Sequence, residues 1–121
     1  MGGDPIEGQI LVLAAAKASV PPKRLPDLIA RVQAALEPDL ERYRHEYERV
    51  HADDEREAFL VEWGHWEDLA LEVTERERAA IRRTHEEQLL RIGRRTDRES
   101  EFESALEIRE PVCIGTSETG H

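Results

Sequence analysis

The chain is poor in cysteine and has no long apolar run, and both shortages narrow what it can be. Its one cysteine, Cys113, allows no disulfide within the chain, which favours a reducing compartment. The longest apolar run, residues 10–16, is far shorter than the roughly 20 residues of a membrane-spanning helix. The first residues lack the basic stretch of a secretory signal. We therefore expect a cytoplasmic protein with no membrane partner.

Sequence motifs of common enzymes are also missing. There is no glycine-rich phosphate loop, no Gly-x-Ser-x-Gly and no Cys-x-x-Cys, and carboxylates are too abundant to single out a pair. We accordingly predict no catalytic residue and no cofactor, and a non-enzymatic protein. Because only six of the 121 residues are aromatic, most of the core must come from Leu, Ile, Val and Ala, as in packed helices.

Charge is the most distinctive feature of the composition. The chain has 27 Asp and Glu against 17 Lys and Arg, for a net charge of −10, and only two of the basic residues are lysines. An acidic, lysine-poor surface suits a protein in molar salt, where the screening length falls to about 3 Å. An arginine-biased genome is the alternative explanation. The negative charge argues against non-specific binding of nucleic acid or anionic membranes by the whole surface.

Apolar residues recur with helical spacing along most of the chain. The clearest stripe runs from Leu25 to Leu36, and Pro26 fixes the start of that helix near residue 24 or 25. Further helices are predicted from residue 5 to about 17 and from Pro38 to about 50. Capping-box pairs, Thr74 with Glu77 and Thr96 with Glu99, open two more helices, the first of which is expected to stop at Gly93.

The segment 58–66 is ambiguous, because Phe59, Trp63 and Trp66 have helical spacing while 58–61 also fits a short strand. We favour a helix here. The predicted fold class is all-α: a compact bundle of five to six short amphipathic helices, with at most a minor two-stranded pair joining 59–61 to 112–114. Residues 1–114 should form a single helical domain, followed by a flexible C-terminal tail over 115–121.

Several strings resemble a known group of proteins. The segments LVLAAAKA (11–18), LPDLI (25–29), GHW (64–66), EEQL (86–89) and FESALEIR (102–109) resemble small uncharacterised acidic proteins of halophilic archaea. None of these strings is a chemical motif. The resemblance implies salt adaptation and a cytoplasmic setting, and it implies no activity.

An arginine cluster is the strongest functional lead. Residues 74–98 hold eight arginines and five acids, a local charge of +3 in a chain whose remainder carries −13. Four of these arginines crowd the turn between the last two predicted helices: Arg91, Arg94, Arg95 and Arg98. They are candidates for binding an anion or nucleic acid. The alternative is that they pair with the surplus carboxylates.

Two further sets of residues are candidates for sites. Trp63, His65 and Trp66 could line a pocket or a partner surface, although tryptophans at this spacing are more often core residues. The Glu-x-x-His pairs Glu48–His51 and Glu62–His65 have the ligand spacing of a metal-binding helix. With twenty glutamates, however, chance alone supplies about one such match. Metal binding is therefore a weak hypothesis.

Three functions follow from these features. The first is a small helical protein-interaction or regulatory module, with self-association as a homodimer. The second is a nucleic-acid-binding regulator that uses the arginines at 91–98. The third is a Glu/His metal-binding bundle.

Overall fold

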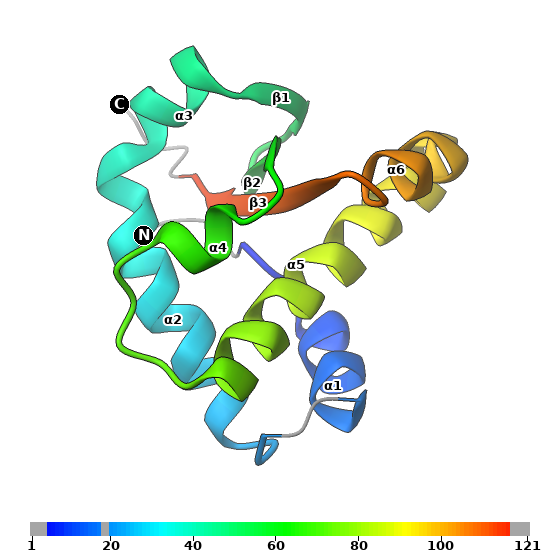
Figure 1. The fold of residues 1–121 in the computed structure, drawn as a ribbon. Coiled ribbons are helices and arrows are strands. Elements are labelled where there is room, and N and C mark those ends of the chain that lie inside the picture. The colour runs from blue at the N-terminus through cyan, green and yellow to red at the C-terminus, as the bar shows by residue number, and fades with distance from the viewer. Residues whose placement is uncertain (1–4, 18–19, 117–121) are drawn as a thin grey trace.

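The computed structural model describes residues 5–17 and 20–116. In chain order the elements are α1 (Gly8–Lys17), α2 (Arg24–Leu36), a 3-10 turn (Glu37–Asp39), α3 (Leu40–Glu46), β1 (Glu48–Ala52), β2 (Arg56–Glu62), α4 (His65–Asp68), α5 (Glu75–Thr96), α6 (Glu99–Ala105) and β3 (Arg109–Gly115) (Figure 1). No helix in the described ranges is long and apolar enough to span a membrane.

The all-α prediction is wrong, because the centre of the molecule is a three-stranded antiparallel sheet in the order β1-β2-β3. The predicted minor pair of 59–61 with 112–114 is also wrong. The two strands that contain these segments pair over seven residues, from Arg56↔Gly115 to Glu62↔Arg109, and in this register 59–61 lie opposite 110–112. The hairpin partner β1 was not predicted. The fold is therefore α+β, with helices packed around a sheet.

The helix predicted across 58–66 fails at β2. This strand is central, and every residue from Arg56 to Val61 is buried, so its apolar run is continuous and lacks the alternation of a half-exposed strand. Gly64 then turns the chain with a φ of 96°, a left-handed conformation that favours glycine. The spacing of the aromatic residues is therefore a coincidence, since Phe59 lies on a strand and Trp66 on α4.

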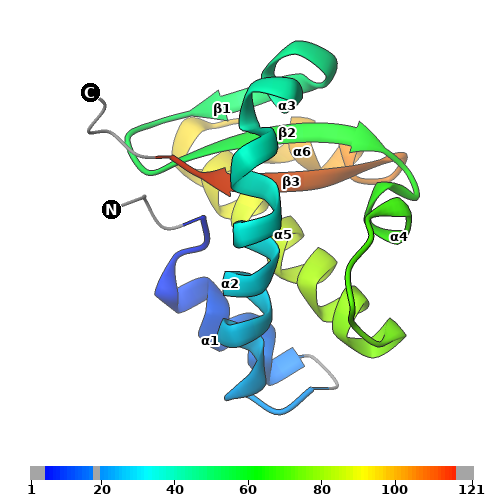
Figure 2. The same cartoon turned by 90° about the vertical axis from the view of Figure 1, so that its left-hand side faces the viewer.

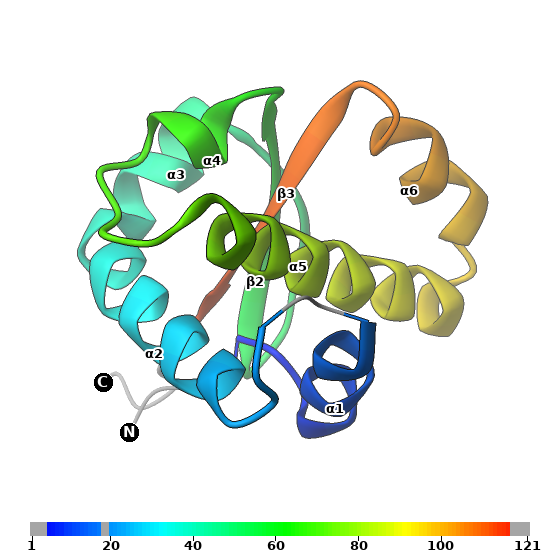
Figure 3. The same ribbon diagram turned by 60° about the horizontal axis from the view of Figure 1, so that its bottom comes forward.

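Helices surround the sheet. In Figure 2, α2 stands in front of the three strands while α5 and α6 lie behind them. The long helix α5 packs against β3, and both α1 and α2 contact α5 (Figure 3). The predicted amphipathic stripe of α2 is confirmed, since Leu25, Leu28 and Val32 are buried.

The free edge of β3 is completed by side chains in place of a fourth strand. The Gln33 amide donates from Nε2 to the Cys113 carbonyl at 2.9 Å and accepts from the Gly115 N–H at 2.9 Å. His85 Nδ1 accepts from the Cys113 N–H at 2.9 Å, and Trp66 Nε1 donates to the Pro111 carbonyl at 3.0 Å. An unpaired strand edge invites pairing with another chain, and these contacts close it.

The ends of α5 show one correct prediction and two errors. Thr74 and Glu77 form the predicted capping box. Gly93 does not stop the helix, which continues to Thr96 and ends at Asp97 in a left-handed conformation. Glycine is needed at 93 because a Cβ there would lie 2.9 Å from the Glu99 Cα. The predicted capping box of Thr96 with Glu99 is absent, since Arg98 precedes α6 without a side-chain cap.

Other predicted boundaries also shift. The helix predicted from Pro38 to 50 ends at Glu46, where the chain turns into β1. At the C-terminus, β3 continues through Gly115, and the Thr116 N–H donates to the Glu55 carbonyl at 2.9 Å. The rest of the predicted tail, residues 117–121, lies outside the described residues.

Candidate functional site

The four arginines that are candidates for binding an anion are each paired with a carboxylate, which was the alternative interpretation. Arg94 Nε lies 2.9 Å from Glu99 Oε2. Arg98 makes two hydrogen bonds to Glu101, at 2.9 and 2.8 Å, and donates to the Val50 carbonyl at 2.7 Å. Phosphate would therefore have to displace a carboxylate that already occupies the guanidinium fork.

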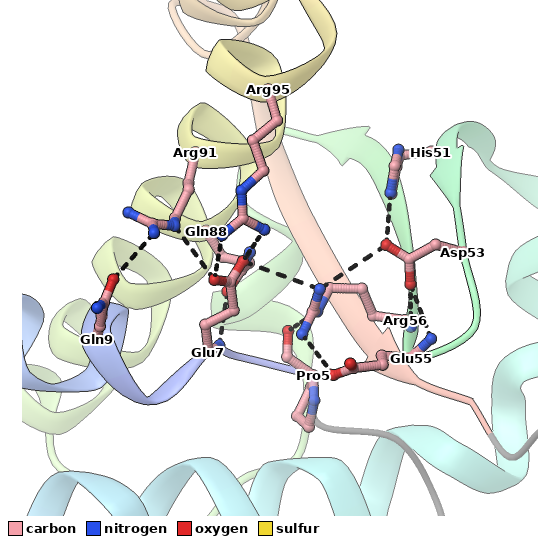
Figure 4. Close-up of polar contacts among 10 residues, drawn as sticks. All are labelled: Pro5, Glu7, Gln9, His51, Asp53, Glu55, Arg56, Gln88, Arg91 and Arg95. Atoms are coloured by element: carbon pink, nitrogen blue, oxygen red, sulfur yellow. Dashed lines mark hydrogen bonds and ion pairs between the residues drawn. The ribbon is translucent and has the colours of Figure 1, made fainter.

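Arg91 and Arg95 both bind Glu7 at the start of α1 (Figure 4). Arg95 donates to the two carboxylate oxygens at 2.7 Å each, and Arg91 Nε donates at 3.2 Å. Gln88 adds a hydrogen bond from Nε2 at 2.9 Å and accepts from the Glu7 N–H at 2.7 Å. Partial burial opposes ionisation of Glu7, but these hydrogen bonds and positive charges outweigh it and hold the pKa of the carboxyl below its ordinary value.

The Glu7 cluster continues into β2 through Arg56, whose side chain is almost completely buried. Arg56 Nε donates to the Pro5 carbonyl at 3.2 Å, and its Nη1 lies 4.0 Å from Glu7 and 3.8 Å from Asp53. In Figure 4 these groups form one chain of contacts from α5 to the β1–β2 turn. The cluster fastens the start of α1 to the sheet and to α5, which is a structural role.

The candidates Trp63 and His65 meet at a cavity of about 290 Å³ beside α4. Trp63 is 60% exposed, and the Arg82 guanidinium lies 5.9 Å from its ring centroid. The third candidate, Trp66, is fully buried. The structure therefore brings two of the three residues together and places Trp66 in the core.

His65 is held by aromatic neighbours. Its Nε2 lies 2.6 Å from the Tyr43 hydroxyl, and its ring meets those of Tyr43 and Tyr47 edge-on at 5.5 and 5.3 Å. Burial lowers the pKa of His65 and raises the pKa of Tyr43. Both groups are consequently neutral near pH 7, and the pair fixes the rings without adding charge to the cavity.

The four metal candidates are not gathered into one site, and two of them are already paired. Glu48 forms an ion pair with Arg109, and His51 Nε2 lies 2.8 Å from Asp53 Oδ2. Glu62 and His65 share the cavity beside α4. Across residues 5–17 and 20–116, no group of three or more His, Cys, Asp or Glu side chains is placed to hold a metal ion.

The surface of α1 exposes apolar side chains, and no sequence motif marks this feature. All seven residues from Ile10 to Ala16 are apolar, yet only Ile10 and Ala14 are buried, while Val12 is 70% and Leu13 48% exposed. A helix that is apolar on all sides is normally buried on all sides. In the sequence, the apolar run 10–16 could have indicated this exposed surface, but it was interpreted only as too short to span a membrane.

Two adjoining hollows line the junction of α1 and α2, with volumes of about 360 and 340 Å³. Leu11 and Pro26 line both hollows, so the two lie next to each other. One extends along Ile29 and Ala30 of α2, and the other along Val12 and Ala15 of α1. We call this surface the α1–α2 groove; apolar side chains form most of its lining.

These features define the class of protein: a small acidic α+β domain with an apolar groove between α1 and α2. The model of a family described as a domain of unknown function (DUF8048) matches residues 4–116, and the chain belongs to that family. No match was found among curated proteins or among solved structures.

Proposed function

We propose that the protein is a non-enzymatic interaction module that associates with a second copy of itself through the α1–α2 groove. The observation that carries this proposal is the exposure of Val12 and Leu13 on a helix that is apolar on all sides. Burying apolar surface in an interface is favourable, with a free energy of about 25 cal/mol for each Å² removed from water.

Charge favours a second copy as the occupant. Residues 1–36, which include α1 and α2, hold four basic and three acidic residues, a net charge of +1, whereas residues 37–121 hold 13 basic and 24 acidic residues, a net charge of −11. Two acidic molecules therefore meet with least repulsion at α1 and α2. In a dimer with two-fold symmetry, the groove of each copy contacts the groove of the other. Both grooves are then occupied, so no third copy can add.

Small residues permit close packing at this surface. Ala15 and Ala16 on α1 and Ala30 and Ala34 on α2 line the hollows, so a helix from the partner can approach the backbone. Val12, which lines the groove and is 70% exposed, supplies a larger side chain that can enter the facing hollow of the second copy. The arrangement needs no rearrangement of the core.

The proposal also includes where the protein acts, namely the cytoplasm of a salt-adapted organism. What supports it is the net charge of −10 and the use of arginine for ion pairs such as Arg95–Glu7 and Arg44–Glu57. High salt screens the repulsion between acidic copies and leaves apolar contact intact. Association should therefore strengthen as salt rises.

The test is the molar mass in solution by light scattering, over a range of protein and salt concentrations. Wild-type protein should form dimers, and Val12→Asp should shift it to monomers at the same concentration. Ile108→Asp is the matched control, because Ile108 is 72% exposed but lies between α6 and β3, away from the groove. A strictly monomeric wild type, or a dimer that survives Val12→Asp, contradicts the proposal.

A further inference from the structure

A separate hollow, of about 310 Å³, lies between the end of α1 and the first half of α5. Its charged lining consists of Lys17, Arg76, Arg82, Arg83 and Glu86. Four cations and one anion give a formal charge of +3, in a chain whose net charge is −10. We call it the basic hollow.

Two of its cations differ from the arginines at 91–98. Within the described ranges, neither Arg76 nor Arg83 has an ion pair or a side-chain hydrogen bond to the protein, and both are exposed. Lys17 Nζ forms an ion pair with Glu87 Oε2 at 3.0 Å. The Arg82 guanidinium lies 3.9 Å from Glu110 Oε2 and 4.0 Å from Glu86 Oε2. The basic hollow thus keeps positive charge that carboxylates neutralise elsewhere.

The shape of the hollow comes from small residues. Ala79 and Ala80 line it between Arg76 and Arg83, which are seven residues apart on α5 and so project from the same side of the helix. Two helical turns separate them by about 10 Å along the axis. The cations therefore stand at opposite ends of a depression that no large side chain fills.

We infer that the basic hollow binds a small phosphorylated anion. Guanidinium groups form paired hydrogen bonds with phosphate oxygens, and two unpaired arginines about 10 Å apart suit an anion with more than one phosphate group better than a single phosphate. The volume corresponds to that of about ten water molecules, which admits a diphosphate group and excludes a large ligand.

The opposing charges keep this site selective. Glu86 lines the hollow, and Glu87 lies at its border through its pair with Lys17. Extended polyanions such as duplex nucleic acid would also meet the acidic surface that carries the net charge of −10. A compact anion within the hollow meets four cations and only one carboxylate, Glu86.

The experiment is calorimetric titration of the full chain with inorganic pyrophosphate, inorganic phosphate and duplex DNA at low salt. Wild-type protein should bind pyrophosphate, more tightly than phosphate, and Arg76→Glu with Arg83→Glu should weaken pyrophosphate binding at least tenfold. Both side chains are exposed, so this variant should remain folded by circular dichroism. The matched control is Lys23→Glu with Arg31→Glu, which makes the same charge change on exposed residues of the α2 region.

Control binding within about threefold of wild type, a difference well under 1.4 kcal/mol, supports a local site. Three results would overturn the inference: no pyrophosphate binding by wild-type protein, an equal loss in both double variants, or binding of DNA without binding of pyrophosphate. The first result would mean that the hollow is not a binding site, and the second that pyrophosphate responds only to the overall charge of the protein. The third would mean that the surface binds extended polyanions.

Discussion

Replacing Gln33 by leucine should destabilise the protein more than any other substitution of an uncharged polar side chain at its β3 edge. Gln33 is buried, and its amide satisfies two backbone groups of β3, the carbonyl of Cys113 and the N–H of Gly115. Leucine has a similar volume, so Gln33→Leu removes the hydrogen bonds while leaving little empty space.

The magnitude follows from the two orphaned groups. Each buried, unpaired backbone group costs about 1–3 kcal/mol, which gives about 2–6 kcal/mol for both. The added apolar surface of leucine returns part of this loss, on the order of 1–2 kcal/mol. We expect a net loss of about 1–4 kcal/mol, out of the roughly 5–15 kcal/mol that stabilises a domain.

Urea unfolding followed by circular dichroism measures this loss as a lower midpoint at an unchanged m-value. Gln9→Leu is the control, because Gln9 is exposed and makes a single side-chain contact, to Arg91 at 2.9 Å; its effect should stay within about 0.5 kcal/mol. Hydrogen exchange should also show faster exchange of the Gly115 N–H. If Gln33→Leu costs no more than Gln9→Leu, the side-chain completion of the β3 edge does not stabilise the fold.

Three further predictions concern His85, Gly93 and Thr74. Burial lowers the pKa of His85 to about 3, so the folded protein keeps it neutral while the unfolded chain, with an ordinary pKa of 6.5, takes up a proton. Its contribution is complete above pH 6.5 and is lost as the pH falls toward 3, on the order of 3 kcal/mol by pH 4.5. His85→Gln should therefore flatten the decline in urea midpoint between pH 7 and 4.5; equal slopes would refute this. Gly93→Ala should lower the unfolding free energy by about 1–3 kcal/mol, because the new Cβ meets the Glu99 backbone at 2.9 Å, whereas Gly8→Ala, with open space around it, should be neutral or stabilising. Thr74→Ala should cost about 1 kcal/mol through loss of the α5 capping box, and Thr74→Ser should retain most of the stability; equal midpoints for the two variants would contradict this.

The sequence predicted the helices well because their signals are local. The stripe of α2 and the capping box of α5 depend on residues three or four positions apart, and both occur in the structure. The strands were missed for the opposite reason. β2 is buried on both faces and reads as a short apolar run, while β1, with the sequence Glu-Arg-Val-His-Ala, has too few apolar residues for its alternation to be visible.

The candidate sites were harder to predict because they depend on pairs far apart in the chain. Glu7 is 84 residues from Arg91 and 88 from Arg95, so nothing local distinguishes these arginines from unpaired ones. The same holds for Arg76 and Arg83, which belong to the predicted basic stretch 74–98 but were not selected from it. A local excess of charge locates a region, and only the tertiary structure shows which of its cations carboxylates already hold.

The groove and the basic hollow lie on different sides of α1, which allows their functions to be separated. Leu11 and Ala15 turn toward α2, whereas Lys17 turns toward α5 and pairs with Glu87. A partner seated in the groove therefore leaves the hollow open. Val12→Asp should abolish dimers and keep pyrophosphate affinity, and the Arg76/Arg83 double variant should do the reverse, as measured by light scattering and calorimetry on the same preparations. Loss of both properties in either variant would show that the two surfaces are one site, with the anion bound between two copies.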